Sequence, residues 1–497
     1  MAIASAYFYI FPYYPKLHSA NELPRVYLVK AIVEDHTFAI DRGVKTWGET
    51  SDLSKYDGRF YQNKAPGASL VAVPVYAIVS WVAGPPSLAV SLWLCRIVTS
   101  VIPSLLFLWL LWGYLARFAP EPATRRLVLV AYAFGSMAFT YAVQFYAHQL
   151  SAVCIASAWI LAEGVADRTR GVRTMAVAGC LAGLAPVVDY QTAFAVVPLL
   201  VYVAWRLRAW SRRELVQAFG LAAIAAAIPL AMLLYYHHAC FGSVFKTGYN
   251  YAVTFGADHE HGLLGMTTPK PVAIWGTLFA PDNGFLILAP WWLLAIRGGV
   301  IRFQRGDRAL VYLIGALVAI FFYFVWSLHA WRAGWEVGPR YIVALQPFLL
   351  PLVATTLAEW RTRPAMIGLA GGLILIGVVI YTVSTATLPS WPANGDSVGA
   401  FTNPLYEVAF RLLGDRAVAS NVLSSLGVVG IVPFLLGILA VVAAAIASAG
   451  AGARGLALAA LIAAAGISAF SLVHSDPQTT RAASAAYART LYPAVAQ

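Results

Sequence analysis

Residues 18–67 read HSANELPRVYLVKAIVEDHTFAIDRGVKTWGETSDLSKYDGRFYQNKAPG and form the longest polar segment of an otherwise apolar chain. Apolar runs of the length that crosses a membrane follow it almost to the C-terminus. The segment carries acidic and basic side chains together, among them Glu22, Arg25, Lys30, Glu34, Asp35, Asp41, Asp52, Asp57 and Lys64. We expect the chemistry of the protein to lie in this mixed-charge loop, above the membrane spans.

The composition is typical of a polytopic membrane protein. Of the 497 residues, 60% are hydrophobic and only 11% are charged, whereas soluble domains contain about 25% charged residues. The net charge of +12 does not indicate nucleic-acid binding, because basic residues on the cytoplasmic side set the topology of membrane proteins. The four cysteines lie in or beside apolar runs without metal-ligand spacing, so we expect them to pack as small apolar residues.

The apolar runs predict an all-α bundle of about 13 transmembrane helices. They cover residues 1–14, 92–116, 127–144, 149–166, 174–187, 190–207, 215–238, 284–298, 309–328, 341–358, 365–386, 423–447 and 456–474. The first run is short, since 14 residues of helix cover about 20 Å, and we expect the true start of the chain to lie upstream.

This pattern divides the chain into four parts. They are the first span (1–14), a first extracytoplasmic loop with surface helices (15–90), a transmembrane core with an outer loop at 239–283 (91–386), and a C-terminal loop with two spans and an outer tail (387–497).

The arginines predict the topology, because their clusters fall in alternate loops. The clusters are Arg117, Arg125 and Arg126; Arg168, Arg170 and Arg173; Arg206, Arg208, Arg212 and Arg213; Arg297, Arg302, Arg305 and Arg308; Arg361 and Arg363; and Arg454. One side of the membrane receives them all, and the positive-inside rule makes that side the cytoplasm. The first loop lies outside only if the apolar run 68–83 does not cross. We therefore interpret 68–83 as an interfacial or re-entrant helix, with a cytoplasmic N-terminus.

Within the first loop, residues 21–34 predict a helix that starts near Ser19 or Asn21 and has Pro24 in its first turn. Such a helix would lie on the membrane surface with Glu22 at its N-terminal end. The rest of the loop is rich in Gly, Asp and aromatic residues, and we expect it to be irregular, with Asp52 and Asp57 forming turns near Gly58.

The order of these features resembles the GT-C superfamily of membrane glycosyltransferases, within it the branch of protein O-mannosyltransferases and lipid A aminoarabinose transferases. That branch begins its first loop with an Asp-Glu pair and a helix, followed by a Lys-Pro-Pro turn. Here Asn21-Glu22 stands in place of the pair, residues 60–67 (FYQNKAPG) stand at the turn, and Arg96 matches an Arg at the start of the second span. The thirteen predicted spans also fit the arrangement of the aminoarabinose transferases.

Further short motifs resemble an uncharacterised bacterial branch of the same superfamily. They are Tyr146-Ala147-His148, Phe241-Gly242-Ser243 with Thr247-Gly248-Tyr249, Leu278-Phe279-Ala280-Pro281, and Gly338-Pro339-Arg340-Tyr341. The resemblance covers roughly residues 1–360. It implies an enzyme of the bacterial inner membrane that moves a sugar from a polyprenyl-phosphate donor to a glycan, lipid or protein acceptor outside the cytoplasm.

Such a reaction needs a carboxylate that takes the proton of the acceptor. In the related enzymes this is the Asp of Asp-Glu, and Asn21 cannot replace it. The role therefore passes to Glu22, with Asp41 as the second candidate. On the residues alone, Glu22 is better explained as a helix-end carboxylate paired with Arg25, and the motif match is what favours the catalytic role.

The reaction also needs cations that hold the donor phosphate, and Lys64, Arg340 and His148 are the candidates. Lys64 could instead reach lipid headgroups, Arg340 could pair with Glu336, and His148 could make ordinary hydrogen bonds. The further candidates of the site are Arg25, Arg96, Asp189 and Tyr341. Of these, Arg96 could be an interfacial anchor or the partner of a loop carboxylate, and Asp189 could cap a helix.

The sequence has no DxD motif, and the paired histidines of the outer loops have poor metal-ligand spacing, so we expect neither a metal nor another cofactor. A transporter or a flippase for lipid-linked sugars is the alternative function. Transporters place charged residues in the middle of their spans, whereas the charges here gather in outer loops. A polysaccharide ligase shares the lipid-phosphate chemistry but does not need this first loop.

Overall fold

The computed structural model describes residues 1–11, 13, 19–254, 256–262, 265–332, 334, 336–389, 401–427, 430–474, 481–482 and 485. This part of the chain is almost entirely helical, with one two-stranded sheet, as the apolar composition predicts. Most of the predicted tail 475–497, the loop residues 390–400 and residues 14–18 lie outside the described residues.

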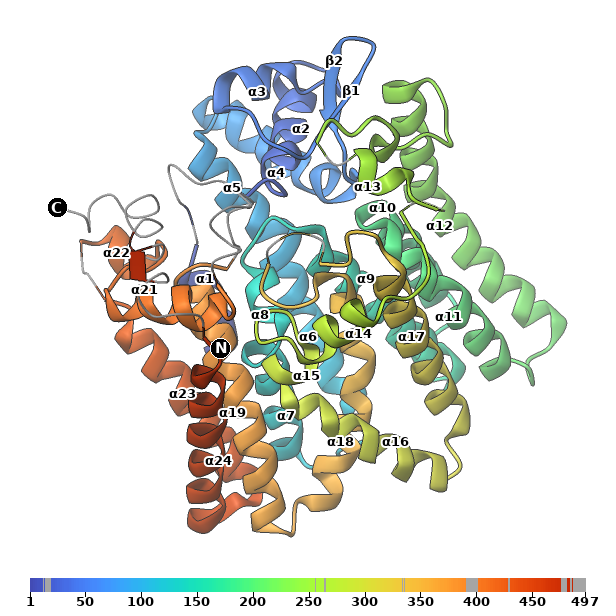
Figure 1. The fold of residues 1–497 in the computed structure, drawn as a ribbon. Helices are drawn as coiled ribbons and strands as arrows, with labels where there is room; N and C mark the ends of the chain where they lie inside the picture. Colours follow the sequence, from blue (N-terminus) through green and yellow to red (C-terminus); the bar gives the residue numbers. More distant parts are fainter. Residues whose placement is uncertain are drawn as a thin grey trace.

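The N-terminal elements form a cap at one end of the helical bundle (Figure 1). The short helix α1 (Ala2–Tyr9) precedes this cap, and α5 leads from it into the bundle. The cap consists of α2 (Leu23–Glu34), α3 (Asp41–Trp47), β1 (Leu53–Tyr56), β2 (Arg59–Gln62) and α4 (Gly67–Ala83).

The remaining elements build the bundle and its connections. They are α5 (Leu88–Arg96), the π-helix η1 (Ile97–Val101), α6 (Ile102–Leu115), α7 (Pro122–Phe134), α8 (Met137–Ala142), α9 (Ala147–Ala166), α10 (Thr174–Val188), η2 (Tyr190–Thr192), α11 (Ala193–Arg206), α12 (Arg212–Phe241), η3 (Gly248–Tyr251), α13 (Gly256–Glu260), α14 (Pro271–Phe279), α15 (Phe285–Leu288), η4 (Pro290–Leu293), α16 (Leu294–Gln304), α17 (Arg308–Ser327), η5 (Arg340–Leu345), α18 (Gln346–Trp360), α19 (Pro364–Ala386), η6 (Leu405–Phe410), α21 (Arg411–Gly414), α22 (Val422–Ser425), α23 (Val432–Ile446), η7 (Ala447–Ala451) and α24 (Gly452–Leu472).

Seven helical segments of the described residues are long and apolar enough to cross a membrane, and α4 and α10 are shorter apolar helices. The predicted count of thirteen spans is therefore not confirmed. Two predicted spans are broken helices. The run 127–144 divides into α7 and α8 at Gly135, where Ser136 caps the second helix by accepting a hydrogen bond from the Ala138 N–H. The run 284–298 divides into α15, η4 and α16 at Pro290.

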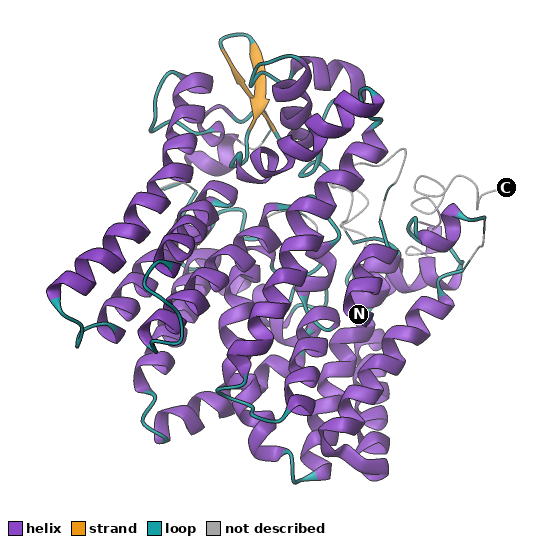
Figure 2. Cartoon of the chain, turned by 180° about the vertical axis from the view of Figure 1, so that it is seen from behind, coloured by secondary structure: helices purple, strands orange, loops and turns teal. Residues whose placement is uncertain are grey.

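The predicted helix 21–34 is confirmed as α2, but the rest of the first loop is more regular than we expected. β1 and β2 form an antiparallel hairpin whose two-residue turn is Asp57-Gly58 (Figure 2). Both turn residues have positive φ, 48° and 74°, which is the geometry of a type I′ turn that matches the twist of the strands. Asp57 is thus a turn former as predicted, whereas Asp52 pairs with Lys64.

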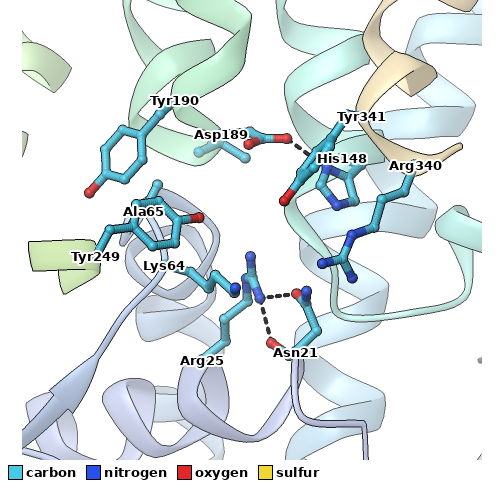
Figure 3. A pocket seen from close by; sticks show the side chains of 11 residues that line it. Asn21, Arg25, Lys64, Ala65, His148, Asp189, Tyr190, Tyr249, Arg340 and Tyr341 are labelled. Atoms are coloured by element: carbon cyan, nitrogen blue, oxygen red, sulfur yellow. Dashed lines mark hydrogen bonds and ion pairs between the residues drawn. The ribbon is translucent and has the colours of Figure 1, made fainter. Parts of the chain in front are cut away.

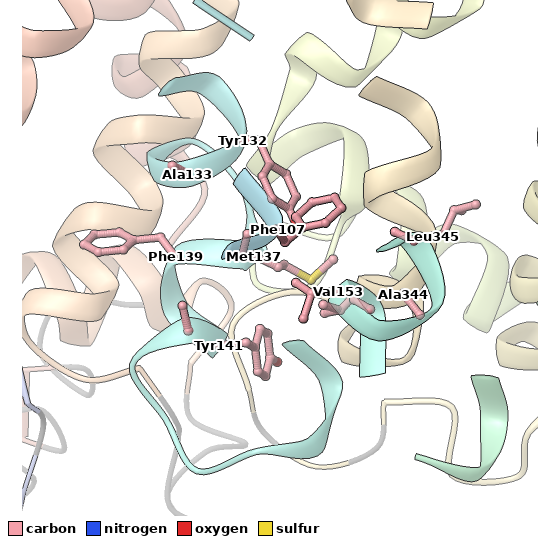
Figure 4. Packing of buried hydrophobic residues seen from close by; sticks show 14 of the residues in the cluster. Phe107, Tyr132, Ala133, Met137, Phe139, Tyr141, Val153, Ala344 and Leu345 are labelled. Carbon is pink, nitrogen blue, oxygen red and sulfur yellow. The ribbon is translucent and has the colours of Figure 1, made fainter. Parts of the chain in front are cut away.

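Burial separates the central helices from the peripheral ones. About nine-tenths of the apolar window of Arg340–Trp360 (89%) and 83% of that of α9 are buried, against 17% for α12. Figure 4 shows the packing at the centre, where Phe107, Tyr132, Met137 and Val153 meet the start of η5–α18. The helices α9 and α18 therefore lie at the centre of the bundle, while α12 lies at its outside.

Two close contacts fix the end of α10 beneath the cap. A Cβ on Gly179 or Gly183 would lie 2.1 or 2.6 Å from a backbone oxygen of α12, so this small-xxx-small pair lets the two helices touch. At the start of α4, a Cβ on Gly67 would lie 2.6 Å from the backbone of Val187. The turn before α4 and the residues after α10 are therefore held side by side.

Candidate functional site

A pocket lies where the cap meets the ends of the central helices (Figure 3). Its walls come from six separate segments of the chain. They contribute Asn21, Arg25, Lys64, Ala65, His148, Val188, Asp189, Tyr190, Tyr249, Arg340 and Tyr341. The pocket thus brings together six of the nine predicted site residues, namely Arg25, Lys64, His148, Asp189, Arg340 and Tyr341.

Three of the lining side chains are cations held by different elements. Arg25 stands in the first turn of α2, Lys64 lies in the turn before α4, and Arg340 begins η5 after Gly338-Pro339. Arg25 and Arg340 are only 3% and 8% exposed. Burial lowers the pKa of Lys64 and of Arg25 from their ordinary values, but a guanidinium remains charged in proteins. Buried cations without compensating anions are unfavourable.

The carboxylates beside these cations leave Arg25 uncompensated. Lys64 Nζ lies 3.2 Å from Asp52, and Arg340 Nη1 lies 3.6 Å from Glu336. Arg25 donates to the main-chain and side-chain oxygens of Asn21, which are neutral. Among the described residues, no carboxylate oxygen lies within 4 Å of its guanidinium. Arg25 therefore has no anionic partner in direct contact, and the carboxylates of Asp52 and Asp189 act on it only from beyond 4 Å.

Hydrogen-bond donors of the same side chains are also unsatisfied. The Nε atoms of Arg25 and Arg340 are buried and have no partner among the described residues. Buried donors in native proteins are nearly always paired. Three convergent cations with spare N–H groups are suited to an anion such as phosphate, which accepts several charge-assisted hydrogen bonds at once.

His148 and Asp189 form a pair on the opposite wall of the pocket. His148 Nδ1 lies 2.6 Å from Asp189 Oδ2, which also accepts a hydrogen bond of 2.9 Å from Gln191. The second ring nitrogen, Nε2, is buried and unpaired among the described residues. The rings of Tyr141 and Tyr341 contact the imidazole edge-on, with centroids 5.7 and 5.9 Å away. The imidazole is thus fixed in orientation.

Two tyrosines that the sequence did not assign complete the pocket. Lys64 Nζ lies 5.4 Å from the ring centroid of Tyr249, and the Tyr190 hydroxyl lies 2.8 Å from His237 Nε2. Tyr249 is held there because a Cβ on Gly248 would lie 2.5 Å from Asn63, so the loop after α12 docks against the end of β2. The Thr-Gly-Tyr motif was a signal for Tyr249, whereas no motif pointed to Tyr190.

Glu22 does not line the pocket. It precedes α2, and its carboxylate is bound side-on by Arg96, with Nε to Oε1 at 2.9 Å and Nη2 to Oε2 at 2.7 Å. Oε1 also accepts the Phe145 N–H. Both residues of the pair are buried. Glu22 therefore pairs with Arg96 and not with Arg25, and Arg96 has a loop carboxylate as its partner, which was one of its two predicted roles. The role of Glu22 as the base stays a prediction. The pair joins the cap to α5 and to the loop before α9.

Asp41 is also outside the pocket. It is the first residue of α3, and its Oδ1 accepts a hydrogen bond of 3.2 Å from the Phe60 N–H. A carboxylate in the first turn of a helix stabilises the helix dipole. Its position therefore favours a structural role, in which it fixes α3 against β2, over the predicted role of a base.

A second buried carboxyl group, Glu336, lies in the loop before η5. The Tyr146 hydroxyl donates to its Oε1 at 2.6 Å, while Oε2 has no partner among the described residues. Burial raises the pKa of Glu336 to about 8, although nearby Arg340 opposes this shift. The carboxyl group is therefore largely protonated below that pH, and it neutralises Arg340 only in part.

The raised pKa of Glu336 predicts that the protein loses stability as the pH rises. Between pH 4.5, the ordinary pKa, and about pH 8, the folded protein holds this proton more tightly than the unfolded chain does. The contribution of Glu336 to the free energy of unfolding is therefore complete below pH 4.5 and is lost as the pH rises through 8. Within this range the free energy of unfolding falls by up to about 1.4 kcal/mol per pH unit. Thermal unfolding in detergent from pH 5.5 to 8.5 should show this loss. Glu336→Gln should flatten the curve, whereas Glu359→Gln, at a partly exposed ion pair with Arg297, should leave it unchanged.

Several solved structures resemble this fold, whereas comparison of the sequence with family models and with curated proteins gives no match. No protein-family model matches the chain, and no curated protein matches it significantly. ArnT from Cupriavidus metallidurans in the apo state aligns with a TM-score of 0.51 at 15% identity, over 94% of this chain and 74% of ArnT. ArnT from the same organism bound to undecaprenyl phosphate aligns at 0.49 and 14% identity, over 95% and 76% of the two chains.

The arabinosyltransferase EmbB from Mycobacterium smegmatis aligns with a TM-score of 0.44 at 14% identity, over 94% of this chain and 42% of EmbB. The likeness to apo ArnT shows that the chain has the GT-C fold of polytopic membrane glycosyltransferases. At this level of identity the likeness establishes the fold, and the function must be argued from the pocket.

Proposed function

We propose that this protein, whose GT-C fold is that of membrane glycosyltransferases, transfers a sugar from a polyprenyl-phosphate donor to an acceptor in the pocket beneath its cap. Arg25, Lys64 and Arg340 hold the donor phosphate. The donor sugar faces the wall formed by His148, Asp189 and Tyr341. No metal ion or other cofactor takes part in this proposal.

The observation that carries the proposal is the uncompensated charge of Arg25. This guanidinium is buried in a pocket that already contains two other cations, and its polar contacts are to a neutral asparagine. A phosphate would supply the missing negative charge and accept the unused N–H groups. When the bond from the sugar to the phosphate breaks, a further negative charge develops on the phosphate, and preorganised cations stabilise that charge most strongly in a water-poor site.

The side of the membrane follows from the arginines. The turn that joins α18 to α19 carries Arg361 and Arg363, and Figure 1 draws it at the opposite end of the bundle from the hairpin β1–β2. By the positive-inside rule, the end with these turns is cytoplasmic. The pocket then opens outside the cytoplasm of a bacterial inner membrane, where the acceptor is a glycan, a lipid or a protein.

The test uses the purified full chain in lipid nanodiscs. Undecaprenyl phosphate should bind at micromolar concentration, and undecaprenol, which has no phosphate, should not. A panel of labelled polyprenyl-phosphate sugars, incubated with envelope extract as acceptor, should give transfer from at least one donor. Arg340→Gln should abolish transfer, whereas Arg297→Gln, at an ion pair on the far end of the bundle, should not.

Equal binding of the phosphate and the alcohol would contradict the proposal. Movement of the labelled lipid across the bilayer without sugar transfer would favour a flippase instead.

A further inference from the structure

We propose that His148 is the general base of the transfer, positioned by Asp189, and that this pair replaces the carboxylate that the first loop lacks at Asn21. The assignment rests on the proposed function. It goes beyond that function because it names the group that receives the proton of the acceptor.

The pocket leaves few groups able to accept a proton. Asn21 is a carboxamide, bound to Arg25. Glu22 is bound side-on by Arg96, and Asp41 supports α3, so neither faces the pocket. Among the described lining residues, Asp189 is the only carboxylate, and its Oδ2 already accepts two hydrogen bonds. The second nitrogen of His148 therefore remains as the acceptor.

The hydrogen bond to Asp189 determines which nitrogen is free. An ionised carboxylate only accepts hydrogen bonds, so Nδ1 carries the hydrogen and the neutral ring has its lone pair on Nε2. This nitrogen is buried and unpaired, at 4% exposure of the residue. The carboxylate also stabilises the imidazolium that forms when Nε2 takes a proton, as an orienting carboxylate does for a catalytic histidine.

The step balances with the groups present. An acceptor hydroxyl attacks the anomeric carbon and forms the new C–O bond, while its proton passes to His148 Nε2. The bond between the anomeric carbon and the phosphate oxygen breaks, and its electron pair stays on that oxygen. The released polyprenyl phosphate is held by the three cations until it leaves. His148 then returns the proton to the departing phosphate or to water, and no oxidant or reductant is needed.

A histidine in this position could instead bind the phosphate directly, and the two roles differ in what a substitution changes. Loss of a base lowers kcat by about 10²- to 10⁴-fold and leaves the affinity for undecaprenyl phosphate within about threefold, since the base contacts the acceptor. Loss of a phosphate ligand lowers that affinity by at least tenfold. The experiment therefore measures both quantities on the same preparations.

The variants are His148→Gln and Asp189→Asn, tested with the donor and acceptor fraction found active for the wild type. His148→Gln should lose kcat in the range above with nearly unchanged binding. Asp189→Asn should lose at least about tenfold in kcat through the misplaced ring. The matched control is His329→Gln, because His329 faces Asp258 at 3.8 Å outside the pocket. Thermal unfolding, measured in the absence of lipid, shows independently of binding that each variant is folded.

Three outcomes overturn the assignment. An unchanged kcat in His148→Gln removes the base role, and a parallel loss of binding and turnover makes His148 a phosphate ligand. If the wild type transfers no sugar from any donor, the proposed function fails and this assignment fails with it. The first two outcomes require an active wild type, so the two failures are distinguishable.

Discussion

Arg25→Gln is expected to weaken phosphate-dependent lipid binding strongly while leaving the free protein as stable as the wild type, or more stable. A charge-assisted hydrogen bond contributes about 1.5–3 kcal/mol, so the loss of one guanidinium should weaken binding of undecaprenyl phosphate by about 10- to 150-fold. In the free protein the same guanidinium is a buried charge beside two other cations, and no carboxylate oxygen of the described residues lies within 4 Å of it. Removal of such a charge also removes its desolvation cost and its repulsion by the two other cations, so the folded protein is not destabilised.

The measurement pairs a lipid-binding titration with thermal unfolding in the absence of lipid. Arg42→Gln is the control, because Arg42 is an exposed arginine of the same cap that pairs with Asp35. Arg42→Gln should leave the lipid affinity unchanged, and it should lower the stability by less than about 1 kcal/mol, the usual contribution of a surface ion pair. Destabilisation of the free Arg25→Gln protein by several degrees would indicate that Arg25 has a structural role and would remove the observation on which the phosphate site rests.

Glu22→Gln is expected to destabilise the folded protein by about 3–5 kcal/mol, because it leaves the Arg96 guanidinium buried without its anion. The double variant Glu22→Gln/Arg96→Met should recover part of this loss, since it also removes the stranded charge. The solvent-exposed pair of Glu121 with Arg361, 3.4 Å apart, provides the comparison, and Glu121→Gln should cost less than about 1 kcal/mol.

Thermal unfolding of the wild type, Glu22→Gln, Arg96→Met and the double variant gives the coupling between Glu22 and Arg96, and sugar transfer per folded molecule gives the catalytic effect. A Glu22→Gln protein with wild-type stability and no activity would restore Glu22 as the base and would contradict the structural role. A destabilised protein whose folded fraction keeps transferring sugar supports the ion pair.

The fold was predictable from hydropathy because the apolar runs are long and their ends are marked by arginines. The helix α2 and the position of the first loop followed from the same patterns. The number of spans did not, because hydropathy does not register the short interruptions at Gly135 and Pro290 that divide apolar runs into separate helices. The hairpin β1–β2 was missed because its strands contain only four residues each.

The members of the site were easier to predict than their partners. Arg25 and Lys64 of the cap and His148, Asp189, Arg340 and Tyr341 at the ends of bundle helices all line one pocket, because the cap lies against those helix ends. Their pairing depends on which helix ends meet. Nothing in the sequence joins Glu22 to Arg96, 74 residues later, or His148 to Asp189, 41 residues later. The structure places Glu22 in an ion pair outside the pocket lining, and its role as the base stays a prediction.

The walls of the pocket have a consequence for biosynthesis. The lining residues run from Asn21 to Tyr341, so about two-thirds of the polypeptide must be synthesised and inserted before Arg340, the last of the three cations, is in place. A ribosome-bound intermediate in which only the earlier helices are inserted therefore has an incomplete pocket. On the proposed function, the donor lipid can bind only after these later helices are in place, so an incomplete chain does not capture it.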